Sequence, residues 1–174
     1  MALFGNEPWP WYNPCSSCIA RFVQGGVVKT FRCATCRMDS VTIKSANGSA
    51  SLVLSNREPF DASSEIGHFT VTLTHDHLTA SSRVYAYMCG GLSQLFAAVA
   101  QNWQTFTGPD SWSSLECEFN IEITHDGLGH FNLRVSLDSR SGDPDWELIS
   151  NVVVETAQLD RIAGDVRSFI GAYA

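Results

Sequence analysis

Apolar and polar residues alternate along most of the chain after Val41, which is the pattern of β-strands with one buried face. The run 41–55 carries Asn47-Gly48 between two β-prone halves, and this dipeptide is a strong hairpin signal. The run 68–88 alternates in the same way and turns back on itself near its middle. We therefore predict two hairpins in the first half of this region.

The period of the apolar residues changes to that of a helix after Gly90-Gly91. This helix is expected to end before Gly108-Pro109, and alternation then returns on both sides of the turn sequence DGLG. The elements expected here are a helix over 91–104, strands over 115–123, 131–137 and 145–155, and a closing helix over 157–173.

The predicted order is thus ββββαβββα, an α+β fold. Hairpins make neighbouring strands antiparallel, and each strand has a single apolar face. We expect a curved antiparallel sheet of about seven strands with two helices on one face. This α+β domain spans 41–174 and is preceded by a small zinc-ribbon-like segment, 1–40.

Charge divides the chain in a similar way, although the net charge of −7 hides it. The first 44 residues hold five basic and two acidic residues, a sum of +3, whereas the remainder holds six basic and 16 acidic residues, a sum of −10. The acidic part would repel nucleic acid and favour a basic partner. No apolar run of about 18 residues is present, so we expect a cytoplasmic protein with no membrane segment.

Two Cys-x-x-Cys pairs lie in the basic segment, at Cys15 and Cys18 and at Cys33 and Cys36. The spacing is that of a tetrahedral zinc site, and a hairpin turning at Gly25-Gly26 can bring the pairs together. Four thiolates leave no open coordination position, so such a zinc ion is structural. The alternatives are disulfides, which a reducing cytosol disfavours, and a leader that does not fold.

The phrase Thr-His-Asp occurs twice, at 74–76 and at 124–126. A further histidine follows each phrase, His77 directly and His130 after three residues. Histidines His75, His77, His125 and His130 together could form a metal or acid/base site if the fold united both phrases. Asp126-Gly127 and Gly129 instead supply turn chemistry, so we interpret both phrases mainly as hairpin turns, with His125 facing His130.

Acidic residues Glu116, Glu118 and Glu122 are predicted on the polar face of one strand, crossed by Arg134 on its neighbour. A pair of such carboxylates could do acid/base chemistry if enclosed, but a solvated sheet face is the simpler interpretation. Cys89 and Cys117 are interpreted as buried small apolar residues.

Residues 92–137 and 145–170 resemble a family of small bacterial domains of unknown function, DUF6228. The most specific pieces are Trp112 to Glu116 and Asp126 to His130, and the resemblance covers about 41–172. This chain departs from the family pattern at Thr105-Phe106, where a Gly-Trp pair is expected. The order of elements in that family is similar to WapI-type toxin-immunity proteins, which implies a binding role by analogy.

Two classes of function follow. The first is a non-enzymatic protein-binding module, an immunity protein whose acidic surface at Glu116, Glu118 and Glu122 neutralises a basic toxin, with Trp112 and Asp110 as further candidates. The second is a nucleic-acid-associated protein whose basic ribbon contacts phosphates while the acidic domain regulates or dimerises. A metal-dependent hydrolase that uses the His-Asp turns is a distant third.

The cysteine spacing predicts about one equivalent of zinc per chain after purification without added metal. Replacement of Cys33 by serine should abolish this binding, because three thiolates hold the ion far less tightly than four. Elemental analysis measures both. A metal content below about half an equivalent, or one that Cys33→Ser leaves unchanged, would contradict the zinc site.

Overall fold

The computed structural model describes residues 19–24, 27–32, 38–60, 66–139 and 146–171. The chain divides into two compact units, Met1–Cys36 and Arg37–Ala174, each of which is considered by itself. In the first unit, strand β1 (Ile19–Gln24) pairs antiparallel with β2 (Val27–Arg32), as the sequence predicts. The four cysteines of the predicted zinc site lie outside the described residues, so that site stays a prediction.

The second unit has the predicted α+β composition, but its strands form two sheets. The first sheet contains β3 (Val41–Lys44), β4 (Ser51–Pro59), β5 (Ile66–His75) and β6 (Leu78–Tyr85) in that order. The second contains, in spatial order, β10 (Glu147–Glu155), β9 (His130–Asp138), β8 (Phe119–His125) and β7 (Asp110–Ser113). All neighbouring strands are antiparallel.

The prediction of one seven-stranded sheet is therefore wrong in two respects. Helix α1 (Gly90–Asn102) separates β6 from β7, and no ladder of hydrogen bonds joins these strands among the described residues. Strand β7 was also missed, because its sequence DSWS has a single large apolar residue and no alternation to reveal it. Residues 115–118, which the sequence pattern places at the start of a strand, belong instead to the turn between β7 and β8.

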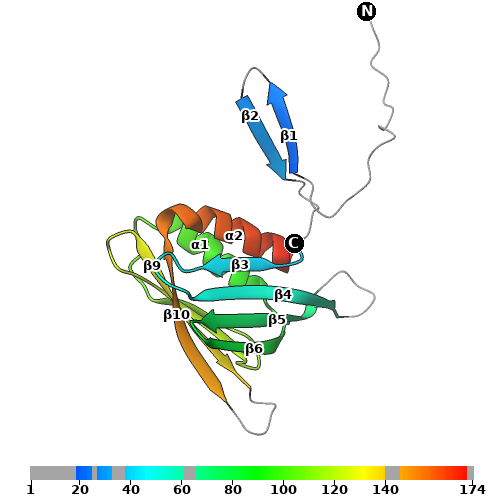
Figure 1. Cartoon of the computed structure of the whole chain (residues 1–174), viewed down its shortest axis with the longest axis vertical. Coiled ribbons are helices and arrows are strands. Elements are labelled where there is room, and N and C mark those ends of the chain that lie inside the picture. The colour runs from blue at the N-terminus through cyan, green and yellow to red at the C-terminus, as the bar shows by residue number, and fades with distance from the viewer. Residues whose placement is uncertain (1–18, 25–26, 33–37, 61–65, 140–145, 172–174) are drawn as a thin grey trace, which may run out of the picture. The chain divides into compact units, whose positions relative to one another are not determined.

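The turn ends of the first sheet meet edge strand β10 of the second. The N–H of Ala46 donates to the carbonyl oxygen of Val153 at 2.7 Å, and the Val153 N–H donates to Ser45 Oγ at 3.2 Å. His75 Nδ1 lies 2.8 Å from Ser150 Oγ on the inner face of β10. In Figure 1 the strands of the two sheets accordingly run in different directions below the helices.

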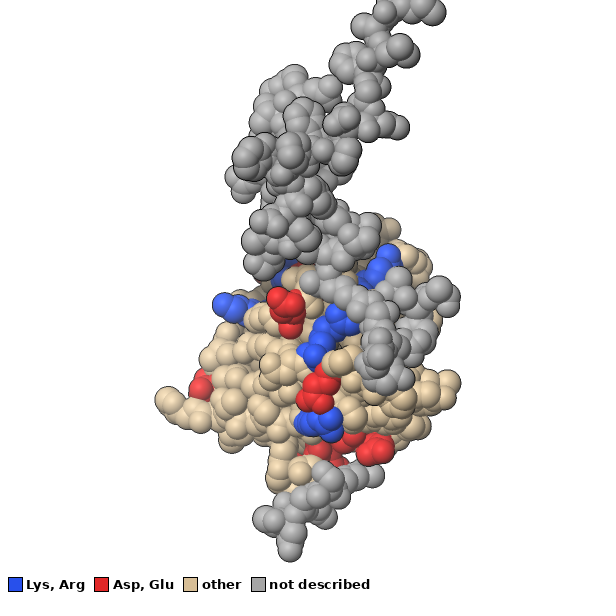
Figure 2. Space-filling view, turned by 90° about the vertical axis from the view of Figure 1, so that its right-hand side faces the viewer, with Lys and Arg blue, Asp and Glu red and all other residues tan. Residues whose placement is uncertain are grey.

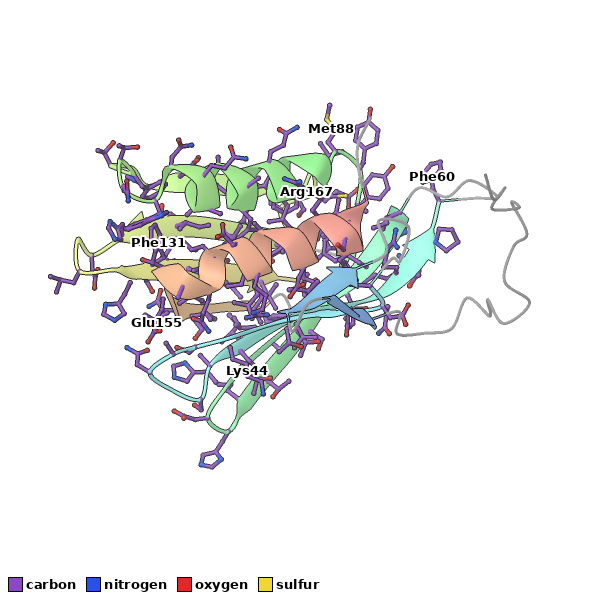
Figure 3. The ribbon with its side chains drawn as sticks, turned by 90° about the horizontal axis from the view of Figure 1, so that it is seen from above. Lys44, Phe60, Met88, Phe131, Glu155 and Arg167 are labelled. Carbon is purple, nitrogen blue, oxygen red and sulfur yellow. The ribbon has the colours of Figure 1, made fainter. Side chains whose placement is uncertain are left out.

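Both sheets and both helices contribute to one hydrophobic core. Helices α1 and α2 (Thr156–Ile170) lie side by side and in contact, as Figures 1 and 3 show from two directions. The ring of Phe69 in the first sheet meets the edge of Phe169 in α2, with ring centres 5.8 Å apart. No helix within the described ranges is long and apolar enough to cross a membrane.

Each helix begins in a different way. Glu155 and Gln158 form a reciprocal capping box at the start of α2, so two otherwise unpaired backbone N–H groups are satisfied. Helix α1 has no side-chain cap and begins with Gly90 and Gly91. A β-carbon at Gly91 would lie 2.9 Å from the indole of Trp112, so this glycine allows β7 to approach the helix.

Gly91→Ala should lower the free energy of unfolding by about 1–3 kcal/mol, because the new methyl group overpacks against Trp112. Gly164→Ala, on the exposed side of α2 with open space around it, is the matched control. It should raise the free energy of unfolding by about 0.5–1 kcal/mol through helix propensity. Urea denaturation of both variants checks the opposite signs, and a stabilised Gly91→Ala would contradict the close approach.

Candidate functional site

A cleft of about 600 Å³ lies beside β6, the edge strand of the first sheet, where the second sheet approaches it. Strands β5 and β6, the β7–β8 turn, the end of β9 and the residue before β10 all line it. Its lining residues are His68, Ser81, Ser82, Arg83, Tyr85, Glu116, Glu118, Asp138, Ser139 and Trp146. Two of the predicted site residues, Glu116 and Glu118, are thus brought into one cleft.

Glu118 joins the two sheets at the base of this cleft. One carboxylate oxygen accepts a 2.6 Å hydrogen bond from the hydroxyl of Ser114, and the other accepts the N–H of Tyr85 on β6 at 3.4 Å. The Glu118 backbone carbonyl accepts the N–H of Asp138 at 2.9 Å. Glu118 is therefore half-buried and structural as well as acidic, so it differs from the solvated strand residue that was expected.

Glu116 and Glu122 occupy different environments. Glu116 is exposed in the β7–β8 turn, whereas Glu122 lies on β8 directly across from Arg134 on β9. The prediction that all three glutamates share one strand face is therefore wrong. Cys117 has a positive φ of 61° in the turn, and this backbone conformation breaks the alternation of a strand. Only the pairing of Glu122 with Arg134 follows the sequence pattern.

Among the described lining residues the one arginine, Arg83, is paired with a carboxylate. Arg83 Nε lies 3.3 and 3.2 Å from the two carboxylate oxygens of Glu58, a forked contact at the sheet surface. The hydrogen bond from Arg83 lowers the pKa of Glu58, and the same contact raises the pKa of Arg83. Among the described lining residues the remaining charged side chains are carboxylates, so the cleft has a negative character.

Aromatic side chains border this acidic region. The rings of His68 and Tyr85 lie 5.3 Å apart across the β5–β6 pair, and Tyr85 stacks on Tyr87 at 6.1 Å. Trp146, the lining residue just before β10, is 37% exposed. Figure 2 shows one face of the molecule, where a column of basic and acidic side chains ends below in acidic ones.

The other predicted contact residues lie apart from the cleft. Trp112 packs on the core with its ring centre 5.7 Å from that of Phe119 and its indole against Gly91, so its main role is structural. Asp110 is exposed at the start of β7, where one carboxylate oxygen accepts the N–H of Ser111 at 3.0 Å. A partner bound in the cleft would therefore not be expected to contact Trp112 or Asp110, which both lie on β7.

The second Thr-His-Asp phrase forms the β8–β9 turn, as predicted. Asp126 Oδ1 accepts the N–H of Leu128 at 2.7 Å and that of His130 at 3.0 Å, while Asp126 Oδ2 lies 2.8 Å from His130 Nδ1. The backbone N–H of His130 is the main reason that the pKa of Asp126 falls to about 2. Gly127 and Gly129 both have positive φ, at 76° and 100°.

His125 does not face His130, contrary to the prediction. Its register partner is Phe131, on whose ring it stacks at 4.4 Å, while His130 turns to Asp126. The offset arises because the turn closes through the Asp126 N–H to the His130 carbonyl oxygen at 3.1 Å. His125 thus packs on its neighbour Phe131, whereas His130 helps to close the turn through Asp126.

The first Thr-His-Asp phrase is also a turn, between β5 and β6. His75 contacts Ser150, and Asp76 is held by the hydroxyl of Ser49 from the β3–β4 turn. Within the described ranges, no three His, Cys, Asp or Glu side chains are placed to hold a metal ion. The arrangement that the hydrolase hypothesis requires is therefore not found among these residues.

The two cysteines of this unit differ from each other. Cys89 is buried at 2% exposure, as predicted, and burial raises the pKa of its thiol to about 11. Cys117 is half-buried in the β7–β8 turn, so the interpretation of Cys117 as a buried residue, within a strand over 115–123, is wrong. Neither one lines the cleft.

Asp126→Asn should destabilise the protein at neutral pH, because a neutral amide oxygen accepts the N–H groups of Leu128 and His130 less strongly than a carboxylate oxygen does. The folded-state pKa of about 2 lies below the ordinary value of 3.8, so the carboxylate stabilises the fold above about pH 4. This contribution is lost as pH falls towards 2.

The difference in urea midpoint between wild type and Asp126→Asn should therefore shrink between about pH 4 and pH 2. Asp160→Asn on the exposed side of α2 controls for the loss of one negative charge. A difference that does not change over this range would refute the role of the ionised carboxylate.

Comparison with known proteins shows to which family the chain belongs. The chain matches the family of unknown function DUF6228 over residues 43–173, which includes nearly all of the second unit and every residue of the cleft. A search of curated proteins gives no match. The chain therefore belongs to the DUF6228 family.

Proposed function

We propose that this protein is a binding module of immunity type, which receives a basic segment of a partner protein in the cleft beside β6. The single observation that carries this proposal is the charge of the cleft. Glu116, Glu118 and Asp138 line it, whereas its arginine is paired with Glu58. A cationic side chain that enters would therefore meet carboxylates and no unpaired cation of the described lining.

The chemistry of the lining supports binding in other ways. Tyr85 and Trp146 provide partly exposed aromatic surface, and tyrosine and tryptophan are enriched at protein interfaces. Glu118 is held in place by Ser114 and Tyr85, so little side-chain entropy is lost when it meets a cation. Close opposite-charge pairs at interfaces are coupled by about 1.5 kcal/mol or more.

The net charge of the domain supports the same proposal. The second unit, residues 37–174, holds eight basic and 17 acidic residues, a sum of −9, so a positively charged protein would be attracted before contact is made. Neutralisation of a toxin fits this character, because an acidic module can cover a basic active site. The similarity of element order to toxin-immunity proteins agrees with this idea as analogy only.

The nucleic-acid hypothesis depends on the basic segment 1–44, and most of that segment lies outside the described residues. Carboxylates along the cleft would repel phosphates, so the cleft does not favour it. Structural zinc at the four cysteines is compatible with either function. A mobility-shift assay with the full chain and nucleic acid separates the two hypotheses.

Glu116→Lys should slow association with a partner recovered from the native host by about tenfold at low salt and weaken the dependence of the rate on ionic strength. Glu116 is suited to this test because it is exposed, and no residue in the described ranges forms a hydrogen bond with its carboxylate. Asp160→Lys, outside the cleft, is the control for the same change in net charge.

The association rate of the control should be within about twofold of the wild-type rate at both salt concentrations. An exposed charge outside the cleft interacts with the partner only at long range, where salt screens the interaction. If the partner is toxic, wild type and Asp160→Lys should protect cells and Glu116→Lys should protect them less. Equal rates for the two lysine variants, or a partner without a basic contact surface, would refute the proposal.

A further inference from the structure

The edge strand β6 has backbone groups that point into the cleft. The N–H of Ala86 donates to the carbonyl oxygen of Gly67 at 2.9 Å, which fixes the alternation of the β5–β6 ladder. Even-numbered residues of β6 bond to β5, and odd-numbered residues direct their N–H and C=O away from it. The bond from the Tyr85 N–H to Glu118 agrees with this alternation.

Two residues in the middle of this edge are open for pairing. Ser81 and Arg83 line the cleft, and no residue in the described ranges forms a hydrogen bond with their outward N–H or C=O groups. Tyr85 at one end of the edge is closed by the Glu118 carboxylate. An unpaired strand edge beside a cavity is the surface to which an extended peptide can add as a further strand.

We propose that the cleft binds its partner by strand addition, in which an extended basic segment pairs with Ser81 and Arg83 of β6. This inference rests on the proposed function and states how the basic segment is held. Backbone hydrogen bonds to Ser81 and Arg83 would give register, and lysine or arginine at alternate positions would meet the exposed carboxylate of Glu116 in the cleft lining.

The charges around the edge determine which strands can add. Charged side chains at an edge oppose pairing between identical edges, because like charges would be brought together. A second copy of this chain would present the same carboxylates and is disfavoured. A basic segment is the favoured occupant, because its cationic side chains are attracted by the carboxylates of the cleft.

The test uses two proline variants that differ only in their place along the edge. Ser81→Pro removes an outward N–H inside the cleft, and Thr79→Pro removes an outward N–H outside it. Each also loses one cross-strand hydroxyl contact, Ser81 to Thr72 and Thr79 to Thr74, so the variants are matched. Neither proline removes a hydrogen bond to β5.

The probe is a capped peptide of about five residues that alternates lysine with valine, a composition suited to an extended basic strand and a length that can pair with Ser81 and Arg83 without reaching Thr79. Ser81→Pro should bind it about tenfold more weakly than wild type, because proline removes a donor and obstructs the added strand. Thr79→Pro should bind it as wild type does. Calorimetry at low salt gives the affinities, and thermal unfolding confirms that both variants fold.

Amide hydrogen exchange of the wild-type protein gives a second readout that needs no variant. The Ser81 and Arg83 amides should exchange fast without peptide and slow by about tenfold or more when it is bound. The amides of Ser82 and Val84 point to β5 and should be protected in both states. Protection of Ser81 and Arg83 by the peptide supports strand addition even if Ser81→Pro fails to fold.

The outcomes separate this inference from the proposed function. Strand addition is overturned if Ser81→Pro binds the peptide like wild type and the peptide leaves the Ser81 and Arg83 amides of the wild-type protein unprotected. A loss of peptide affinity in Glu116→Lys alone would still support an acidic binding cleft. A loss with Ser81→Pro but not with Glu116→Lys supports strand addition and contradicts the electrostatic proposal. Equal losses in both proline variants, or no binding to wild type, overturn strand addition.

Discussion

The fold depends on how two separate sheets close around one core without sharing a strand. Each sheet has one apolar face, and neither could keep that face from water alone. The sheets meet at two junctions, one between Ala46 and Val153 of β10 and the other around Glu118. Because Glu118 bonds to β6 through its side chain and to Asp138 through its backbone, the second junction forms the base of the cleft.

That junction also explains why the cleft is acidic and open. A carboxylate can accept one outward N–H of β6, but it cannot continue the ladder as a strand would, so the pairing stops at Tyr85. The groups of Ser81 and Arg83 beyond it face the cavity. The interaction that joins the sheets therefore leaves both a negative charge and an unpaired edge at one place.

Local patterns predicted the elements well because local chemistry determines them. Alternation revealed β5, β6, β8 and β9, the helical period revealed α1 and α2, and Asp126-Gly127 revealed the turn. Strand β7 was missed because Trp112 gives no period by itself. The division into two sheets and the cleft have no local signal, since a strand with one buried face has the same pattern in either arrangement and residues far apart in sequence line the cleft.

The residues by which the sequence resembles its family are mainly those that build the fold. Trp112 packs against Gly91, Ser114 closes the β7–β8 turn with Glu118, and Asp126 closes the β8–β9 turn. Ser81 and Arg83 on β6 lie outside those two motifs and are exposed in the cleft, so their side chains can change without disturbing the scaffold contacts. In the proposed strand addition, recognition of the partner would thus use backbone groups and exposed side chains that these scaffold contacts do not need.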